Sequence, residues 1–272
     1  MNLPQEVHAV LSDLLAAIQR ALGDQLVGVY LRGSLATGDF IPETSDIDAL
    51  AVTEHPVDDA QFAILAALHA QLSRSPDPFA NQVEIAYIDR AALRRFRPGL
   101  RHPTLGRGET LAWTEHQSNW ILERWTLREQ GIALYGPDPR ALIDAVSPDE
   151  IVPAVRARLQ DWADWARTPD DPDWRLPRSH KAYAVETMCR GLYVLARGEL
   201  SSKRQAVAWA LETLPEPWRS TVRRSQAWRT DNTVDLDIVP EVRQFVLWAA
   251  SCQPAAAPEK GVVSSDRGDR AG

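Results

Sequence analysis

The sequence has few cysteines and no long apolar run, and each shortage excludes a class of protein. Its 272 residues include two cysteines, Cys189 and Cys252, which lie far apart and outside any CxxC pair. Neither a disulfide framework nor a zinc site is therefore expected. No apolar run approaches the roughly 18 residues that span a bilayer, and the N-terminus lacks the basic and apolar segments of a secretory signal. We expect a cytoplasmic protein with reduced thiols and no membrane partner.

The charge of the chain argues against a nucleic-acid partner. The formal net charge is −7, whereas a general nucleic-acid binder needs a basic surface that displaces counterions. Residues 1–150 hold 21 acidic residues, 12 arginines and no lysine. This acidic half is suited to metal ions or to a cationic substrate, although a solvated acidic surface explains the same counts equally well.

Hydrophobic patterning divides the chain into two parts. The first part predicts helices at 5–22 and 58–74 and strands at 26–32, 46–53, 82–88 and 109–113. The second part predicts helices at 115–130, 148–167, 179–197, 203–213, 216–228 and 240–251. We expect an α/β domain with a small mixed sheet over 1–140, an all-α helical bundle domain over 141–253 and a disordered tail over 254–272.

Gly33 and Ser34 follow the first predicted strand directly. Glycine lets the backbone approach a bulky anion closely. The N–H groups of such a turn, together with a serine hydroxyl, can hold phosphate oxygens. A lone Gly-Ser pair is a weak signal, because most such pairs are ordinary turns.

Asp46 and Asp48 begin the second predicted strand. Residues i and i+2 of a strand share a face, so the two carboxylates are expected side by side with Ile47 turned into the core. They repel each other unless a cation lies between them, and Mg²⁺ prefers such oxygen ligands. Glu84 lies in a later strand and could reach the same face, as a metal ligand or as the base for an attacking hydroxyl. Solvent-facing acids remain the alternative for each part taken alone.

The combination of these features resembles a known superfamily. The stretch LRGSLATGDFIPETSDID, residues 31–48, resembles the streptomycin and spectinomycin adenylyltransferases, which are polymerase-β-type nucleotidyltransferases. The similarity continues in GLYVLARGELSSKRQAVAWALETLP, residues 191–215, and in SQAW, residues 225–228. It implies a polymerase-β-like nucleotidyltransferase domain followed by a helical domain.

The resemblance also implies roles for individual residues. Asp46, Asp48 and Glu84 would form the catalytic and metal-binding set, with Glu84 as the general base. ATP would be the co-substrate, together with Mg²⁺, two ions in all. The residues implied in nucleotide binding are Gly33, Ser34, Ser45, Arg190, Lys203 and Trp228.

The acceptor side is expected to combine indoles and acids. Trp113 lies near a tryptophan that stacks on the drug in the resembling enzymes. Residues 161–174 are rich in tryptophan and aspartate, a chemistry suited to a cationic sugar, and Trp174 is chosen there as a contact. Helix packing explains these tryptophans equally well. Residues 175–181 are basic where the family pattern is acidic, which opposes the binding of a cationic drug.

These observations together predict an enzyme. We expect a monomeric, Mg²⁺-dependent nucleotidyltransferase that moves AMP from ATP to a hydroxyl of a small cationic acceptor, an aminoglycoside or a spectinomycin-like compound. This activity would give antibiotic resistance. Two alternatives remain open from the sequence: a toxin-like nucleotidyltransferase that acts on a protein or tRNA, and a non-catalytic module that binds a nucleotide or drug.

Overall fold

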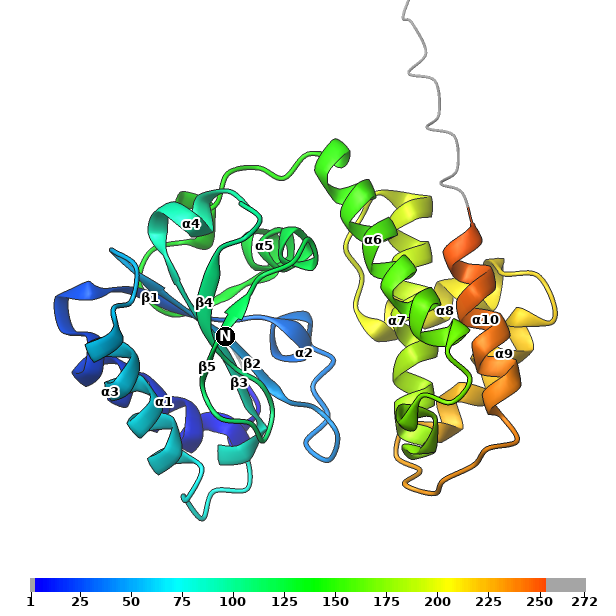
Figure 1. Ribbon diagram of the computed structural model, residues 1–272, viewed down its shortest axis with the longest axis horizontal. Helices are drawn as coiled ribbons and strands as arrows, with labels where there is room; N and C mark the ends of the chain where they lie inside the picture. The colour runs from blue at the N-terminus through cyan, green and yellow to red at the C-terminus, as the bar shows by residue number, and fades with distance from the viewer. Residues whose placement is uncertain (1–2, 253–272) are drawn as a thin grey trace, which may run out of the picture.

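A six-stranded mixed sheet organises the N-terminal part of the computed structural model, which describes residues 3–252 (Figure 1). The strand order is β5-β4-β3-β2-β1-β6. Strands β2 and β3 are parallel, and the other neighbouring pairs are antiparallel. The strands are β1 (Leu26–Leu31), β2 (Ile47–Thr53), β3 (Val83–Asp89), β4 (Arg101–Leu105), β5 (Ala112–Glu115) and β6 (Ile132–Tyr135).

Helices cover both faces of this sheet and determine which way its side chains point. On one face, α1 (His8–Leu22) and α3 (Asp59–Leu72) bury Ile47, Ala49 and Ala51 of β2. On the other face, α4 (Arg90–Arg94) and α5 (Asn119–Gln130) bury Leu50 and Val52. Strand side chains alternate between the faces, so Asp48 lies on the α5 face, as do Arg32 at the end of β1 and Glu84 in β3.

The C-terminal part is helical throughout. Trp125, on α5, joins its hydrophobic core, so α5 connects the sheet to the helices. The 20-residue helix α7 ends at Gly198, which adopts the left-handed conformation. Several side chains of α7 face the cleft described below. The helices are α6 (Pro148–Arg167), α7 (Arg178–Arg197), α8 (Lys203–Thr213), α9 (Trp218–Ser225) and α10 (Val239–Ser251).

The predicted fold class, a small mixed sheet followed by a helical region, is confirmed. The errors concern short elements. β4, β6 and α4 were missed, because a strand that contains Pro103, a four-residue strand and a five-residue helix carry little periodicity. The predicted strand at 109–113 is β5, and the helix expected from residue 115 begins at Asn119.

Two further expectations concern the C-terminal tail and the absence of membrane-spanning segments. The tail expected over 254–272 lies outside the described residues. Within residues 3–252, no helix has the length and apolar character that crossing a membrane requires. We keep residue 140 as the proposed boundary between the two domains.

Candidate active site

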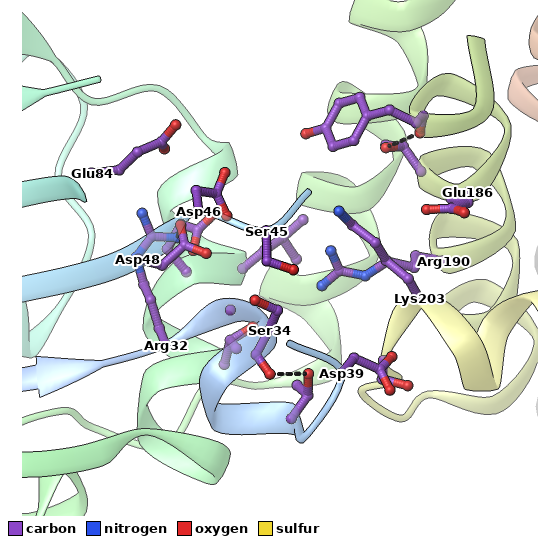
Figure 2. Close-up of a pocket in the computed structure, with 18 of the residues that line it drawn as sticks. Arg32, Ser34, Asp39, Ser45, Asp46, Asp48, Glu84, Glu186, Arg190 and Lys203 are labelled. Atoms are coloured by element: carbon purple, nitrogen blue, oxygen red, sulfur yellow. Dashed lines mark hydrogen bonds and ion pairs between the residues drawn. The ribbon is translucent and has the colours of Figure 1, made fainter. Parts of the chain in front are cut away.

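A cleft of about 970 Å³ lies between the sheet and the helical region. Figure 2 shows that Ser34, Asp46, Asp48 and Glu84 approach it from the sheet side, while Arg190 and Lys203 approach from the helices. The cleft therefore brings together most of the residues singled out in the sequence.

The Gly33-Ser34 turn begins the short helix α2 (Gly33–Thr37) at the end of β1. Gly33 has φ +60°, and a Cβ there would overlap the Asp48 carboxylate. Only glycine therefore allows this turn to pack against Asp48. The buried Ser34 Oγ has no hydrogen-bond partner within the protein, and an unpaired buried hydroxyl is costly unless a ligand pairs with it. The turn thus presents a free polar group to the cleft.

Asp48 and Glu84 lie on the neighbouring parallel strands β2 and β3, and Asp46 lies directly before β2. Asp48 and Glu84 are register partners between β2 and β3, and the fully buried Ile47 points into the core, as predicted. Burial, and then repulsion by Asp46 and Asp48, raise the pKa of Glu84 to about 7. Burial and the charge of Asp48 raise the pKa of Asp46 as well. The carboxylates concentrate negative charge in one place.

Arg32 is a member of this site that sequence reasoning missed. Its Nη1 lies 3.3 Å from Asp48 Oδ1 and 2.6 Å from Glu123 Oε2. Burial opposes its charge, but Glu123 and Asp48 together raise the pKa of the guanidinium. The sequence signal was present, because an arginine directly before Gly33 on a buried strand needs a partner.

The acidic residues fit a divalent cation in an open arrangement. Within residues 3–252, no three His, Cys, Asp or Glu side chains form a preassembled group that could hold an ion. Asp46 and Asp48 nevertheless repel each other in a partly buried place, and a cation between them would relieve that repulsion. Mg²⁺ commonly takes one or two carboxylates and completes its shell with water and substrate phosphates, which suits such a site.

The helical side of the cleft is basic. Arg190 of α7 and Lys203, the first residue of α8, both line it. Lys203 Nζ lies 4.9 Å from the centre of the Tyr183 ring, and its charge partly offsets the rise in the pKa of Asp46 that burial and Asp48 cause. A negatively charged ligand on the Ser34 turn would therefore face two cations across the cleft.

Ser45 also lines the cleft, but its hydroxyl has a structural partner. Its Oγ accepts a hydrogen bond of 2.9 Å from the Ile41 N–H. Ser45 therefore shapes the loop that leads into Asp46.

Three tryptophans expected near the ligands lie elsewhere, and these expectations are corrected. Trp113 of β5 stacks on Phe62 of α3, with ring centres 5.4 Å apart, because its side chain points to the α1 and α3 face. Trp174 is 3% exposed and donates to the Thr168 carbonyl, and Trp228 is 6% exposed. Both belong to the core of the helical region, and none of the three lines the cleft.

A smaller pocket of about 180 Å³ adjoins the cleft and uses other members of the indole-rich segment. Arg158 and His180 line both spaces. The indole Nε1 atoms of Trp162 and Trp165, both buried, have no hydrogen-bond partner within the protein. Asp161 and Asp173 complete the lining with exposed carboxylates. The pocket thus offers indole donors, aromatic surface and negative charge.

The arginines and the lysine of the basic stretch 175–181 line neither space, and the pKa of His180, which lines both, is lowered by burial. Arg178 is paired with Asp231 and Asp235. Lys181 is fully buried, and its ammonium donates to the Trp174 carbonyl at 2.7 Å and to the Leu176 carbonyl. The sequence departure from the acidic pattern is therefore largely neutralised by internal partners.

Comparisons with known proteins agree with this architecture. Residues 11–94 match the nucleotidyltransferase domain family, and residues 141–250 match the C-terminal domain of aminoglycoside adenylyltransferases. The aminoglycoside (3'') (9) adenylyltransferase of Shigella flexneri is 27% identical over 227 residues, which is 80% of this chain and 83% of the relative. The spectinomycin 9-adenylyltransferase of Campylobacter jejuni is 25% identical, over 78% and 80% respectively.

A solved structure shows the same fold. The spectinomycin adenylyltransferase from Enterococcus faecialis, crystallised with ATP and spectinomycin, has a TM-score of 0.71 and 16% identity, covering 89% of this chain and 98% of that one. The two family matches fall on the sheet and on the helices that together form the cleft. The chain therefore combines a nucleotidyltransferase domain with a helical domain that matches the C-terminal domain of aminoglycoside adenylyltransferases, and it is a nucleotidyltransferase.

Proposed function

We propose that the protein transfers AMP from ATP to a hydroxyl group of a small amino-sugar or aminocyclitol antibiotic, in a Mg²⁺-dependent reaction, and thereby gives resistance. The register pairing of Asp48 with Glu84, opposite the free hydroxyl of Ser34, carries this proposal. This arrangement would put a carboxylate base, a cation site and a phosphate-binding turn within one cleft. The names of the relatives, which act on aminoglycosides and spectinomycin, support the acceptor class.

The triphosphate would lie between the Ser34 turn and the basic helical wall. Ser34 Oγ, unpaired within the protein, would donate to a phosphate oxygen. Lys203 and Arg190 would offset the charge of the departing pyrophosphate from the other side. Because these groups are already held in place by folding, little reorganisation is needed during the reaction.

Glu84 would take the proton of the acceptor hydroxyl. Its pKa of about 7, raised by burial and by its acidic neighbours, suits a general base at neutral pH. The hydroxyl oxygen would then form a bond to the α-phosphorus as the bond to the leaving pyrophosphate breaks. Arg32 would keep Asp48 in position through its contact with Oδ1.

Asp46 and Asp48 would hold the magnesium. The bound ion would supply charge neutralisation for the phosphates and the transferring group. Glu84, which was expected in the metal-binding set, would remain free for proton transfer in this arrangement.

The acceptor would reach from the cleft into the smaller pocket. The rings of Trp162 and Trp165 would offer aromatic surface to the acceptor, and Asp173 can attract an ammonium group. This proposal assigns to Trp165 and its neighbours the role that the sequence pattern predicted for Trp174.

A single chain supplies all the groups of the proposed site, which supports action as a monomer. Its two free cysteines support a reducing, cytoplasmic setting.

A pyrophosphate-release assay with ATP and Mg²⁺ tests the function directly. Spectinomycin, streptomycin and other amino-sugars are offered singly, and mass spectrometry of the product identifies an added AMP. The Asp48→Asn variant should lose this activity, because the substitution removes a carboxylate charge from the cation site. Release without a modified antibiotic, or an equally active variant, would refute the proposal; label transferred from ATP to a protein or tRNA would favour the toxin-like alternative.

A further inference from the structure

Asp39 joins the two sides of the cleft. It follows α2 in the sheet-containing part, and its carboxylate Oδ2 accepts a hydrogen bond of 3.1 Å from the backbone N–H of Arg204 in α8. The Arg204 guanidinium is a weaker partner, since its Nε lies 3.6 Å from Oδ1 and its side chain is 69% exposed. The stronger contact is therefore the one made with the helix backbone.

The contact lies beside Lys203. Residues 203 and 204 are the first two of α8, whose leading N–H groups have no partner within the helix. Ser202 caps the helix by accepting from the Gln205 N–H. Asp39 accepts from the neighbouring N–H, so a carboxylate of one domain completes the cap of a helix in the other. Because Lys203 is the adjacent residue, its backbone position follows this contact.

Asp39 is also tied to the phosphate-binding turn. Its own N–H donates to the Ser34 carbonyl at 3.0 Å, and Gly38, at φ +75°, makes the bend between them. One residue thus has a backbone bond to Ser34 and a side-chain bond to the residue after Lys203. Figure 2 shows Asp39 near both Ser34 and Lys203. Its side chain is 16% exposed, so this arrangement is largely shielded from water.

We infer that Asp39 is a positioning residue that closes the cleft and fixes Lys203 opposite Ser34, so that both groups meet the ATP phosphates at once. The inference rests on the proposed function and adds to it a residue that lines the cleft and would act through Lys203. If the closed arrangement is populated less often without Asp39, the apparent affinity for ATP falls by the same fraction. The acceptor affinity and the chemistry of Glu84 should change much less.

The test is a double-mutant cycle between Asp39→Ala and Lys203→Met, with the KM for ATP measured at saturating spectinomycin and ATP binding measured by calorimetry without acceptor. We expect Asp39→Ala to raise the KM for ATP and the dissociation constant of ATP about tenfold in the parent protein. In the Lys203→Met background the same substitution should raise them less than about twofold, because the effects of coupled residues are not additive. Full additivity would overturn the inference, since Asp39 would then act independently of Lys203.

Three further variants distinguish the effect of the Asp39 contact with the α8 backbone from a general loss of structure. Asp39→Asn keeps an oxygen that can accept the Arg204 N–H, and Arg204→Ala keeps that N–H, so both should stay within about threefold of the parent. Asp13→Ala, at an exposed position of α1, is the matched control. If Arg204→Ala matches the loss of Asp39→Ala, the backbone contact is not the cause and the inference fails. If the unsubstituted protein shows no ATP-dependent activity, the proposed function itself is refuted.

Discussion

Asp48 and Glu84 are register partners on the parallel strands β2 and β3, although the helix α3 separates them in the sequence. Their environments differ. Asp48 contacts the Arg32 guanidinium, which keeps a positive charge beside it. Glu84 is half-buried among acids, and burial first and then this repulsion raise its pKa to about 7. In the proposed mechanism, Asp48 would therefore hold the cation and Glu84 would transfer the proton.

Glu84→Gln should therefore abolish turnover while leaving the nucleotide in place. Loss of a general base typically costs about 10²–10⁴ in kcat, and we expect a loss in this range with the KM for ATP changed less than about threefold. Steady-state kinetics and calorimetric ATP binding check both halves of the expectation. Glu115→Gln, an exposed position of β5, serves as the control. Comparable kcat values in the variant and the parent would assign the base role elsewhere.

Gly33→Ala should be inactive for a reason other than lost stability. The new methyl group would overlap the Asp48 carboxylate, and alanine is strained at φ +60°. Gly99→Ala is a matched control for the strain, because Gly99 has φ +79° with open space around its Cβ position. Both variants should lose about 1 kcal/mol of unfolding free energy. Only Gly33→Ala should lose more than about a hundredfold in kcat/KM; an equal effect on activity would contradict the proposed packing of the turn.

The sequence predicted the sheet side of the site better than the helical side. Ser34, Asp46, Asp48 and Glu84 lie on or beside strands, where the period of two fixes the face of a side chain as soon as its neighbours are known to be buried. Ile47, fully buried between the two aspartates, is such a reference point. The pattern indicated that these side chains could converge, and the family resemblance supplied the set, whereas the Arg32 bridge to Glu123 depends on how α5 packs.

Tryptophans in the helical part could not be assigned in the same way. Trp165 and Trp174 stack on each other with ring centres 3.7 Å apart, yet Trp165 lines the small pocket while Trp174 is buried behind it. Both are tryptophans in a segment rich in acids, so the sequence suggests either one as a ligand contact. Which of the two lines the pocket depends on the fold of the loop at residues 168–177. The charges of Arg178 and Lys181 posed the same problem, since only the folded loop supplies their partners.

Asp173→Asn should weaken the acceptor and spare the nucleotide. Its carboxylate lines the small pocket but is exposed, so the variant should fold normally. We expect the KM for a cationic amino-sugar to rise roughly three- to tenfold, since a charge-assisted contact is lost, with the KM for ATP unchanged. Asp164→Asn on α6, which is exposed and does not line the pocket, is the control. If neither KM responds to Asp173→Asn, the acceptor binds outside this pocket.

His69 should make the protein less stable in mild acid. It is 4% exposed on α3, its Nε2 lies 2.7 Å from the Tyr87 hydroxyl, and burial lowers its pKa from 6.5 to about 4. The unfolded chain therefore binds more protons than the folded one between these two values. The neutral ring's contribution to the free energy of unfolding is fully present above pH 6.5. It is lost as the pH falls towards 4, by up to about 3 kcal/mol.

Urea unfolding at pH 7, 5.5 and 4.5, followed by tryptophan fluorescence, measures this loss. The parent should lose more unfolding free energy over this range than His69→Gln, which has no titrating group at that position. Three other histidines, His102, His116 and His180, also have pKa values lowered by desolvation, but their contributions cancel in the comparison. His55→Gln, at an exposed position, should follow the parent. Equal losses in the parent and in His69→Gln would mean that the folded protein accommodates the charged ring, against the burial seen here.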